Sequence, residues 1–183
     1  MRIGADGLAR GARYLASPNC DARPSGARVS LLVVHSISLP PGRYGGDAVA
    51  RLFTNRLDPR AHRAFRDIFH MRVSAHFFVR RDGALQQFVP VHRRAWHAGA
   101  SRWRARERCN DISIGVELEG LEGQSFTPAQ YGCLARLVRA LQKKYTLRAC
   151  AAHSDVAPGR KRDPGARFDW PRFLRALAQP SKR

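Results

Sequence analysis

Three side chains capable of chemistry lie close together near the end of this 183-residue chain. His153, Lys161 and Asp163 fall within residues 150–165, a segment that also contains Pro158, Gly159, Pro164 and Gly165. Prolines and glycines at this density exclude a helix, so we expect a rigid loop that holds the three side chains. A neutral imidazole nitrogen and a carboxylate oxygen are both suitable ligands for zinc.

A third ligand has to come from elsewhere in the chain. His35 directly follows Leu31-Leu32-Val33-Val34, a run typical of a fully buried strand. Three protein ligands leave a fourth position for water, as in catalytic zinc sites. Taken singly, such a histidine is more often a core residue, and such a loop is usually a solvated connection. The combination favours a metal site, with Cys150 as a weaker alternative ligand than Asp163.

Five further segments occur in order along the chain before residue 150. They read LVVHSISLPPG (32–42), RVSAH (72–76), RAWHAG (94–99), RERCND (106–111) and SIGVELEG (113–120). With residues 150–165, they resemble the zinc-dependent N-acetylmuramoyl-L-alanine amidases, in particular the cytoplasmic Gram-negative enzymes that act on 1,6-anhydro-muropeptides. The resemblance runs from about residue 12 to residue 177.

The resemblance implies a site and a reaction. One Zn²⁺ would be held by His35, His153 and Asp163, with water in the fourth position. Glu117, which the family pattern selects over Glu119, would be the general base and acid, and Lys161 would stabilise the oxyanion. The implied substrate contacts are Ser36, Arg72, Trp96 and Arg108. Ser36 departs from the asparagine usual in the family, which puts its substrate hydrogen bond in doubt.

The implied reaction is hydrolysis of an amide bond in a cytoplasmic muropeptide. The bond joins the lactyl group of 1,6-anhydro-N-acetylmuramic acid to L-alanine. Its cleavage belongs to peptidoglycan recycling, and it affects β-lactamase induction by removing a signalling muropeptide. The residues themselves support this chemistry, because zinc can activate water for attack on an unreactive amide.

The elements that must position these residues alternate between strands and helices. We expect strands at 31–35, 112–118 and 147–152, and a hairpin of strands 75–79 and 85–89 turning at Asp82-Gly83. Residues 48–52 are predicted to form a helical turn, whereas 59–71 is weakly helical at best. A helix should start at Thr127 with a capping box to Gln130 and carry a buried stripe of Leu134, Leu137, Val138 and Leu141. A last helix should be capped by Asp169, with Phe168 packed on Phe173 and an apolar face of Leu174 and Leu177.

This order predicts an α/β (α+β) fold in which helices flank a mixed central sheet, within a single catalytic domain spanning residues 1–183. The resembled family has this zinc amidase fold, which it shares with peptidoglycan recognition proteins. His76 and His97 are predicted to have structural or supporting roles, and His62, His70 and His92 to lie on the surface. We expect a monomer.

Composition sets limits on other functions. The N-terminus lacks the apolar core of a signal peptide and no apolar run could span a bilayer, so we expect a cytoplasmic protein that does not bind membranes. Cys20, Cys109, Cys133 and Cys150 form no CxxC pair, which favours free thiols.

The net charge of +19 raises nucleic-acid binding as a hypothesis. However, the 33 basic residues are spread along the chain without a recognition motif, which favours a general bias toward arginine and no specific nucleic-acid partner. Only four of them are lysines, and one is Lys161. A compact ammonium retained there is consistent with a catalytic role.

Two other rivals concern the site itself. His153-Ser154-Asp155 matches half of the iron-binding motif of oxygenases, but that motif needs a later histidine and none follows. A peptidoglycan-binding module without catalysis would lack a metal ligand, whereas all three ligands are present here. Measuring bound zinc and muropeptide turnover would separate this second rival from an enzyme.

Overall fold

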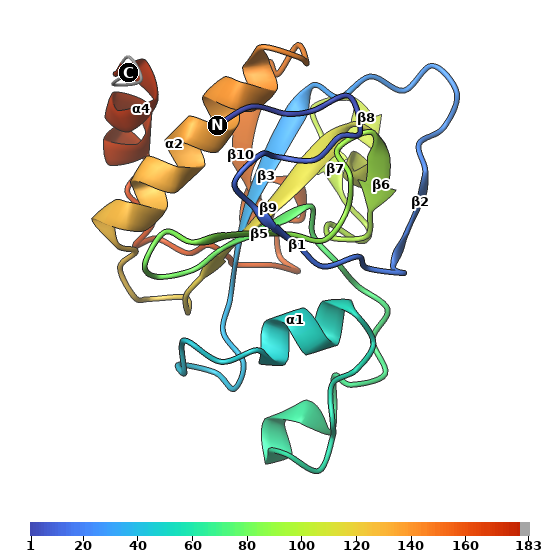
Figure 1. Ribbon diagram of the computed structural model, residues 1–183, viewed down its shortest axis with the longest axis vertical. Helices are drawn as coiled ribbons and strands as arrows, with labels where there is room; N and C mark the ends of the chain where they lie inside the picture. Colours follow the sequence, from blue (N-terminus) through green and yellow to red (C-terminus); the bar gives the residue numbers. More distant parts are fainter. Residues whose placement is uncertain (180–183) are drawn as a thin grey trace.

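The computed structural model describes residues 1–179 and is built around one six-stranded sheet (Figure 1). The strands lie in the order β1-β5-β4-β9-β3-β10. Their bounds are β1 Arg13–Tyr14, β3 Leu31–Ile37, β4 Phe77–Val79, β5 Leu85–Gln87, β9 Ser113–Glu119 and β10 Ala149–Ala152. β10, β3, β9 and β4 run parallel to one another, while β4 and β5 form the expected antiparallel hairpin. The predicted mixed sheet is therefore confirmed.

Two small antiparallel ribbons lie outside the main sheet. One pairs β2 (Cys20–Ala22) with β6 (Arg93–Ala95), and the other pairs β7 (Arg102–Trp103) with β8 (Arg106–Glu107). None of these four strands was predicted. Strands of two or three residues are too short to show a period in the sequence, and β2 and β6 are also far apart along the chain.

The long helices cover one face of the main sheet. α2 (Pro128–Gln142) packs against α4 (Trp170–Ala178), and Figure 1 shows both on the same side. The predicted capping box is present, with Thr127 Oγ1 accepting from Gln130 N and Gln130 Oε1 accepting from Thr127 N. In α4, Asp169 caps the helix and Phe168 packs near Phe173 as expected.

Shorter helical segments complete the chain. They are α1 (Ala48–Phe53), α3 (His153–Val156) and the 3₁₀ turns η1 (Arg63–Phe65) and η2 (Cys109–Asp111). No described helix is long and apolar enough to cross a membrane. All four cysteines are unpaired, as predicted.

Two expectations about the helices were wrong. Residues 153–156 form one helical turn, although the segment was expected to contain no helix; the prolines and glycines begin only at Pro158, so the turn fits before them. Leu174 was expected on the buried face of the last helix, but it is 56% exposed. Phe173, the preceding residue, fills that position instead and is fully buried.

Side chains of β3 point alternately to the two faces of the sheet, so the residues that pack under the long helices and the residue that could do chemistry lie on opposite faces. Leu32 and Val34 point toward α2, in the core that contains Leu134 and Leu137. Leu31 and Val33 point to the opposite face, toward α3 and the loop around Ala98. Because side chains in a strand alternate between faces, His35 emerges on this second face, away from the long helices.

Candidate functional site

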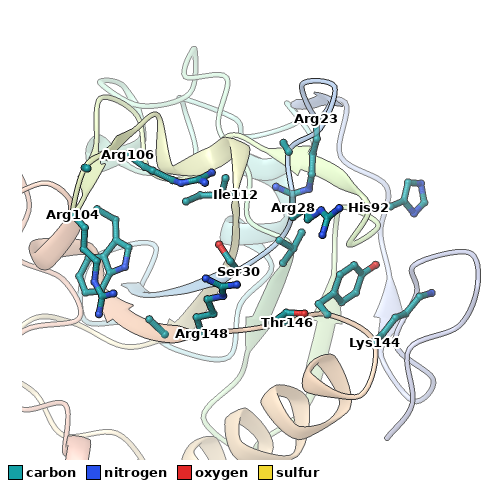
Figure 2. A pocket seen from close by; sticks show the side chains of 16 residues that line it. Arg23, Arg28, Ser30, His92, Arg104, Arg106, Ile112, Lys144, Thr146 and Arg148 are labelled. Atoms are coloured by element: carbon teal, nitrogen blue, oxygen red, sulfur yellow. The ribbon is translucent and has the colours of Figure 1, made fainter.

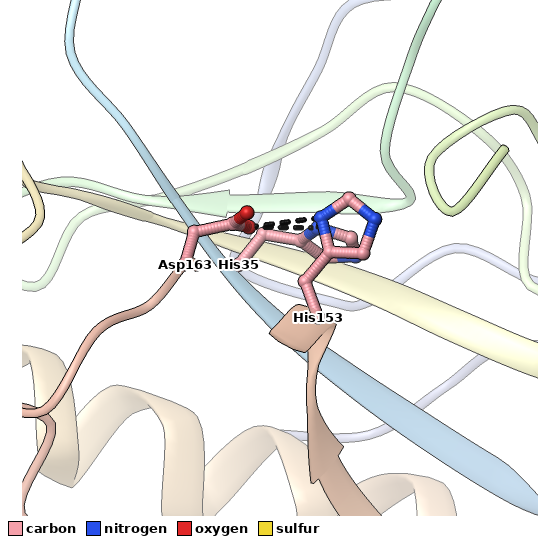
Figure 3. Close-up of side chains that lie close together, drawn as sticks. All are labelled: His35, His153 and Asp163. Atoms are coloured by element: carbon pink, nitrogen blue, oxygen red, sulfur yellow. Dashed lines mark hydrogen bonds and ion pairs between the residues drawn. The ribbon is translucent and has the colours of Figure 1, made fainter. Parts of the chain in front are cut away.

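Three side chains meet at the carboxyl-terminal edge of the parallel strands. His35 is in β3, His153 opens α3 immediately after β10, and Asp163 lies in the following loop (Figure 3). The Nδ1 atoms of the two histidines are 2.9 Å apart. Asp163 Oδ2 is 3.0 Å from His153 Nδ1 and 3.3 Å from His35 Nδ1. The loop is held in place by Ser154 N, which donates to the carbonyl of Asp163 at 3.0 Å.

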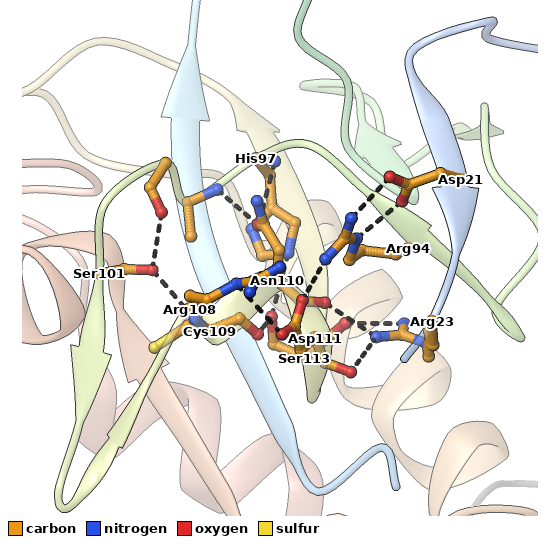
Figure 4. A network of polar contacts seen from close by, with 12 residues as sticks. Asp21, Arg23, Arg94, His97, Ser101, Arg108, Cys109, Asn110, Asp111 and Ser113 are labelled. Atoms are coloured by element: carbon orange, nitrogen blue, oxygen red, sulfur yellow. Dashed lines mark hydrogen bonds and ion pairs between the residues drawn. The ribbon is translucent and has the colours of Figure 1, made fainter. Parts of the chain in front are cut away.

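The outer ring nitrogen of His35 is fixed by a chain of hydrogen bonds. Ser113 Oγ donates to the Cys109 carbonyl at 2.6 Å, so the hydroxyl accepts from His97 Nε2 at 3.1 Å (Figure 4). With its proton on Nε2, His97 offers an Nδ1 lone pair to His35 Nε2 at 2.9 Å. His35 therefore carries its proton on Nε2, and its Nδ1 is a bare lone pair.

His153 is fixed in the same tautomer. Its Nε2 lies 3.3 Å from the carbonyl oxygen of Ala98, which can only accept a hydrogen bond. The lone pairs of His35 Nδ1 and His153 Nδ1 therefore converge, together with Asp163 Oδ2, without a proton to share between them. A cation bound between these atoms would be attracted to all three and would offset the repulsion between their lone pairs. Tetrahedral zinc with bonds of about 2.0–2.1 Å separates its ligand atoms by roughly 3.4 Å, close to the distances found here.

Burial keeps His35 and the neighbouring His97 neutral. It lowers the pKa of His35 to about 4, an effect that Asp163 only partly offsets. Burial also lowers the pKa of His97 well below its ordinary value, and the neighbouring His35 adds to this shift. Both rings are thus neutral near pH 7, and for His35 this is the state in which an imidazole binds metal.

A glycine allows His97 to reach its position. A Cβ atom at Gly115 of β9 would lie 2.4 Å from Cγ of the His97 ring, which real contacts essentially never allow. On the other side, Asn110 Oδ1 accepts from the backbone N–H groups of His97 and Ala98 at 3.3 and 2.9 Å. The sequence predicted a supporting role for His97, but neither of these contacts.

Glu117 lies beside the three convergent residues. It pairs with His35 in the register of β9 and β3, and it is 9% exposed. Burial raises the pKa of its carboxyl group well above the ordinary value, and Asp163 raises it further, while the charge of Lys161 opposes the shift. Among the described residues its Oε2 atom is one of few buried polar atoms without a hydrogen-bond partner. Such an atom is available to water or a ligand.

Glu119, the alternative carboxylate on the same strand, is fully engaged. It accepts from the N–H groups of Gly45 and Arg81 at 2.8 and 3.0 Å and pairs with Arg80 Nε at 3.4 Å. These contacts tie two loops to the sheet. Glu119 is therefore structural, whereas Glu117 faces the cleft.

A cleft of about 520 Å³ opens over these residues. Ser36 and Lys161 line it, and Ser36 Oγ is a second buried polar atom without a partner. Arg160 also lines the cleft and donates to the carbonyls of Ala98 and Ala100, a role that the sequence did not suggest. One wall is apolar and consists of Ile37, Leu39, Leu52, Phe53, Ile68, Met71 and Val73. Most of these residues come from segments 48–53 and 62–71, where no motif pointed to a site, and Val73 belongs to the RVSAH segment.

Three predicted substrate contacts lie outside the lining of this cleft. Arg72 is exposed and donates to the His70 carbonyl. Trp96 is half-buried; its carbonyl accepts from Ser74 N and its N–H donates to Ser74 Oγ, and Ser74 does line the cleft. Arg108 is exposed and lies 3.5 Å from the Asp111 carboxylate. Their roles stay predictions.

The other histidines lie away from the three convergent residues. His76 is buried, accepts from Gly115 N through Nδ1 and contacts the Arg93 carbonyl through Nε2. His70 and His92 are exposed as expected. His62 was predicted to be a surface residue, but it is half-buried and caps η1 through Nδ1.

Known proteins share this sequence and fold. Residues 25–166 match the family described as N-acetylmuramoyl-L-alanine amidase. The 1,6-anhydro-N-acetylmuramyl-L-alanine amidase AmpD of Escherichia coli K12 is 53% identical over 165 residues, which are 89% of this chain and 90% of that protein. The crystal structure of a Se-Met AmpD derivative superimposes with a TM-score of 0.94 at 49% identity, covering 97% of this chain and 99% of the other.

A more distant structure carries a ligand. It is the complex of the amidase AmiD from Escherichia coli with the substrate anhydro-N-acetylmuramic acid-L-Ala-D-gamma-Glu-L-Lys, with a TM-score of 0.61 at 29% identity. The match covers 85% of this chain and 60% of AmiD. The family match covers most of this sequence, and the alignment with the AmpD of Escherichia coli covers about nine-tenths of both proteins. The chain therefore belongs to the N-acetylmuramoyl-L-alanine amidase family.

Proposed function

We propose that this protein cleaves the amide bond between the lactyl group of 1,6-anhydro-N-acetylmuramic acid and L-alanine in muropeptides. The observation that carries the proposal is the convergence of His35, His153 and Asp163 beside the buried, unpartnered carboxyl group of Glu117. The AmpD relatives, named for the 1,6-anhydro substrate, support the choice of bond. We also propose that residues 1–183 form one catalytic domain, which acts as a monomer in the cytoplasm. Its role is in peptidoglycan recycling and, through that, in the control of β-lactamase induction.

We assign the metal as one zinc ion held by His35 Nδ1, His153 Nδ1 and Asp163 Oδ2, with water as fourth ligand. The donor set of two imidazoles and one carboxylate suits zinc, and the fixed tautomers aim both lone pairs at one point. Zinc supplies Lewis acidity, which polarises a carbonyl and lowers the pKa of water to about 7.

Side chains of the protein then transfer protons and stabilise the developing charge. Glu117 Oε2 takes a proton from the attacking water and returns it to the departing nitrogen of L-alanine, a role that its raised pKa suits. The ammonium of Lys161 lies at the same cleft and stabilises the negative charge that develops on the carbonyl oxygen. Ser36 Oγ is available to bond the substrate. Arg72, Trp96 and Arg108 are proposed to contact parts of the muropeptide that extend beyond the cleft.

The test is mass spectrometry of products from anhydro-muropeptides, with wild type and Glu117→Gln. We expect wild type to release the free peptide and anhydro-N-acetylmuramic acid, and the variant to lose about 10²–10⁴-fold in rate, the usual contribution of a general acid–base group. The variant should retain zinc, since Glu117 is not a ligand. Equal turnover by both proteins would remove Glu117 from the mechanism.

The same experiment addresses a binding module without catalysis. A protein that lacks zinc as purified and stays inert after zinc is added would contradict the hydrolase and favour peptidoglycan binding alone. The convergent lone pairs argue against that outcome.

A further inference from the structure

A second, larger pocket lies at the opposite edge of the parallel sheet (Figure 2). It has a volume of about 710 Å³, within the range of pockets that hold small ligands. Ser30, Ile112 and Arg148 line it, and these residues immediately precede β3, β9 and β10. Its floor is thus formed by the starts of three strands whose far ends lead to the cleft with the candidate metal ligands.

The lining of this pocket has one sign of charge. Its cationic residues are Arg23, Arg28, Arg104, Arg106, Lys144 and Arg148, and no aspartate or glutamate is among its sixteen lining residues. Trp103 and Tyr145 add aromatic surface. In Figure 2, the labelled arginines come from several separate segments of the chain and surround one hollow. Six of the 33 basic residues, which are spread along the sequence, therefore gather around this pocket.

Two of the six cations have structural partners. Arg23 donates to the carbonyls of Asn110, Asp111, Val91 and Ser113, and Lys144 donates to that of Gly4. By contrast, the guanidinium groups of Arg28, Arg104, Arg106 and Arg148 make no hydrogen bond to a carboxylate and no ion pair within residues 1–179. All four residues are exposed. They are available to a ligand.

Arg104 is held in an unusual backbone conformation. Its φ of 55° lies in the left-handed region, where glycine or asparagine is the common choice. The residue lies in the tight turn between β7 and β8, and its guanidinium sits 5.9 Å from the centre of the Trp103 ring. A cation and an aromatic face are thus presented together at the pocket.

We propose that this basic pocket binds a compact polyphosphate, supplied as a nucleoside polyphosphate or as a free oligophosphate. Guanidinium groups match phosphate oxygens in a planar, two-point geometry. Four guanidinium groups without ion-pair partners in the part of the chain that the structure describes surround one hollow, so they favour a ligand that carries several negative charges in a small volume. Adjacent phosphates provide that density, whereas single carboxylates spread along a peptide do not.

The surroundings favour a small ligand over a nucleic-acid strand. Nucleic-acid channels extend a basic track along the backbone for several nucleotides. Here, the adjoining hollow shares Ala27, Arg106 and Ile112 with the basic pocket but adds Glu107 and Asp111. Carboxylates at this border would repel a continuing phosphate backbone, so the positive surface ends at the pocket on that side.

The test is calorimetric titration of the full chain with magnesium-free ATP and, separately, with inorganic tripolyphosphate, at about 0.15 M salt, where distant charges are screened. The test variant is Arg28→Gln/Arg148→Gln. The matched control, Arg136→Gln/Arg175→Gln, removes the same charge from exposed positions on α2 and α4. We expect one saturable site in wild type, at least about a tenfold loss of affinity in the test variant from the lost charge-assisted bonds, and near-wild-type affinity in the control.

The two ligands identify the source of the phosphates. Tighter binding of ATP would indicate a nucleotide whose base uses the aromatic surface, and tighter binding of tripolyphosphate a free oligophosphate; both support the proposal. Equal losses in the two double variants would overturn it by showing that only net charge matters. A single-stranded 15-mer that binds more tightly than either ligand and displaces ATP would overturn it in favour of nucleic acid, and absence of saturable binding would also end it. Circular dichroism and muropeptide turnover verify that each variant is folded.

Discussion

The two edges of the same parallel sheet carry opposite kinds of site. The candidate metal cleft balances three cations, Arg160, Lys161 and Arg162, against three carboxylates, Glu117, Glu122 and Asp163. The basic pocket has six cations and no carboxylate. Leu31 and His35 on β3 mark the two edges and are four residues apart, or about 13 Å at the usual rise of a strand.

The difference lies in how each region obtains its chemistry. In the cleft, His35, His153 and Glu117 are buried, and fixed hydrogen bonds decide which histidine nitrogen carries a proton and which offers a lone pair. In the basic pocket, exposed guanidiniums supply charge without fixed partners. In a site that depends on fixed geometry, one substitution should remove most of the activity. In a site that depends on charge density, each lost charge should lower the binding affinity by a further increment.

Removing a convergent ligand should have the largest effect. His153→Ala should abolish stoichiometric zinc and lower muropeptide turnover by about three orders of magnitude or more, since a Lewis acid contributes several kcal/mol to such reactions. Metal analysis and product assays measure both. His92→Ala is the matched control, because that histidine is exposed and lines the basic pocket. Full zinc content and turnover in His153→Ala would refute the metal assignment.

Changing the partner of His35 should have an intermediate effect. His97→Leu removes the acceptor for His35 Nε2, and we expect zinc affinity to fall by about 10–100-fold, as is typical for residues that orient a metal ligand. His97→Asn should restore part of the affinity, because its Oδ1 can occupy the place of Nδ1. Competition with a chromogenic chelator reports the affinity. If the two variants bind zinc equally, the tautomer argument fails.

The ionisation of Glu117 should make stability depend on pH. Its carboxyl has a higher pKa in the folded than in the unfolded chain, so its contribution is most favourable below the unfolded value of about 4.3 and declines as pH rises. Glu117→Gln cannot ionise. In zinc-free protein, it should exceed wild type in unfolding free energy near pH 7 by roughly 1 kcal/mol, and the difference should vanish near pH 4. Urea unfolding at both pH values measures this, and a difference independent of pH would contradict it.

The smallest effect on catalysis should come from the basic pocket. Arg28→Gln/Arg148→Gln should leave muropeptide turnover within about twofold of wild type, because the two edges are separated by more than a screening length of about 8 Å. Steady-state assays at two salt concentrations suffice. A larger loss at low salt only would show that the pocket steers the substrate toward the cleft, which would join the two regions in one function.

Local patterns were enough for several elements. The apolar run before His35, the Asp82-Gly83 turn and the Thr127 capping box each depend on neighbouring residues, and each is present in the structure. By contrast, the sequence could not show that α1 and residues 62–73 supply an apolar wall of the cleft. That wall exists only because these segments pack in one apolar cluster with Ile37 at the end of β3 and with Leu39 in the loop that follows.

By itself, the sequence singled out His35, His153 and Asp163 as candidate ligands and predicted the strand that carries His35 and the loop that carries Asp163. Only the tertiary structure decided that Glu119 is engaged while Glu117 is not, and that four unpaired arginines from separate segments surround one pocket. The physical reason is that propensity and alternation act over a few residues, whereas burial, tautomer and charge density depend on which distant segments the parallel sheet brings together.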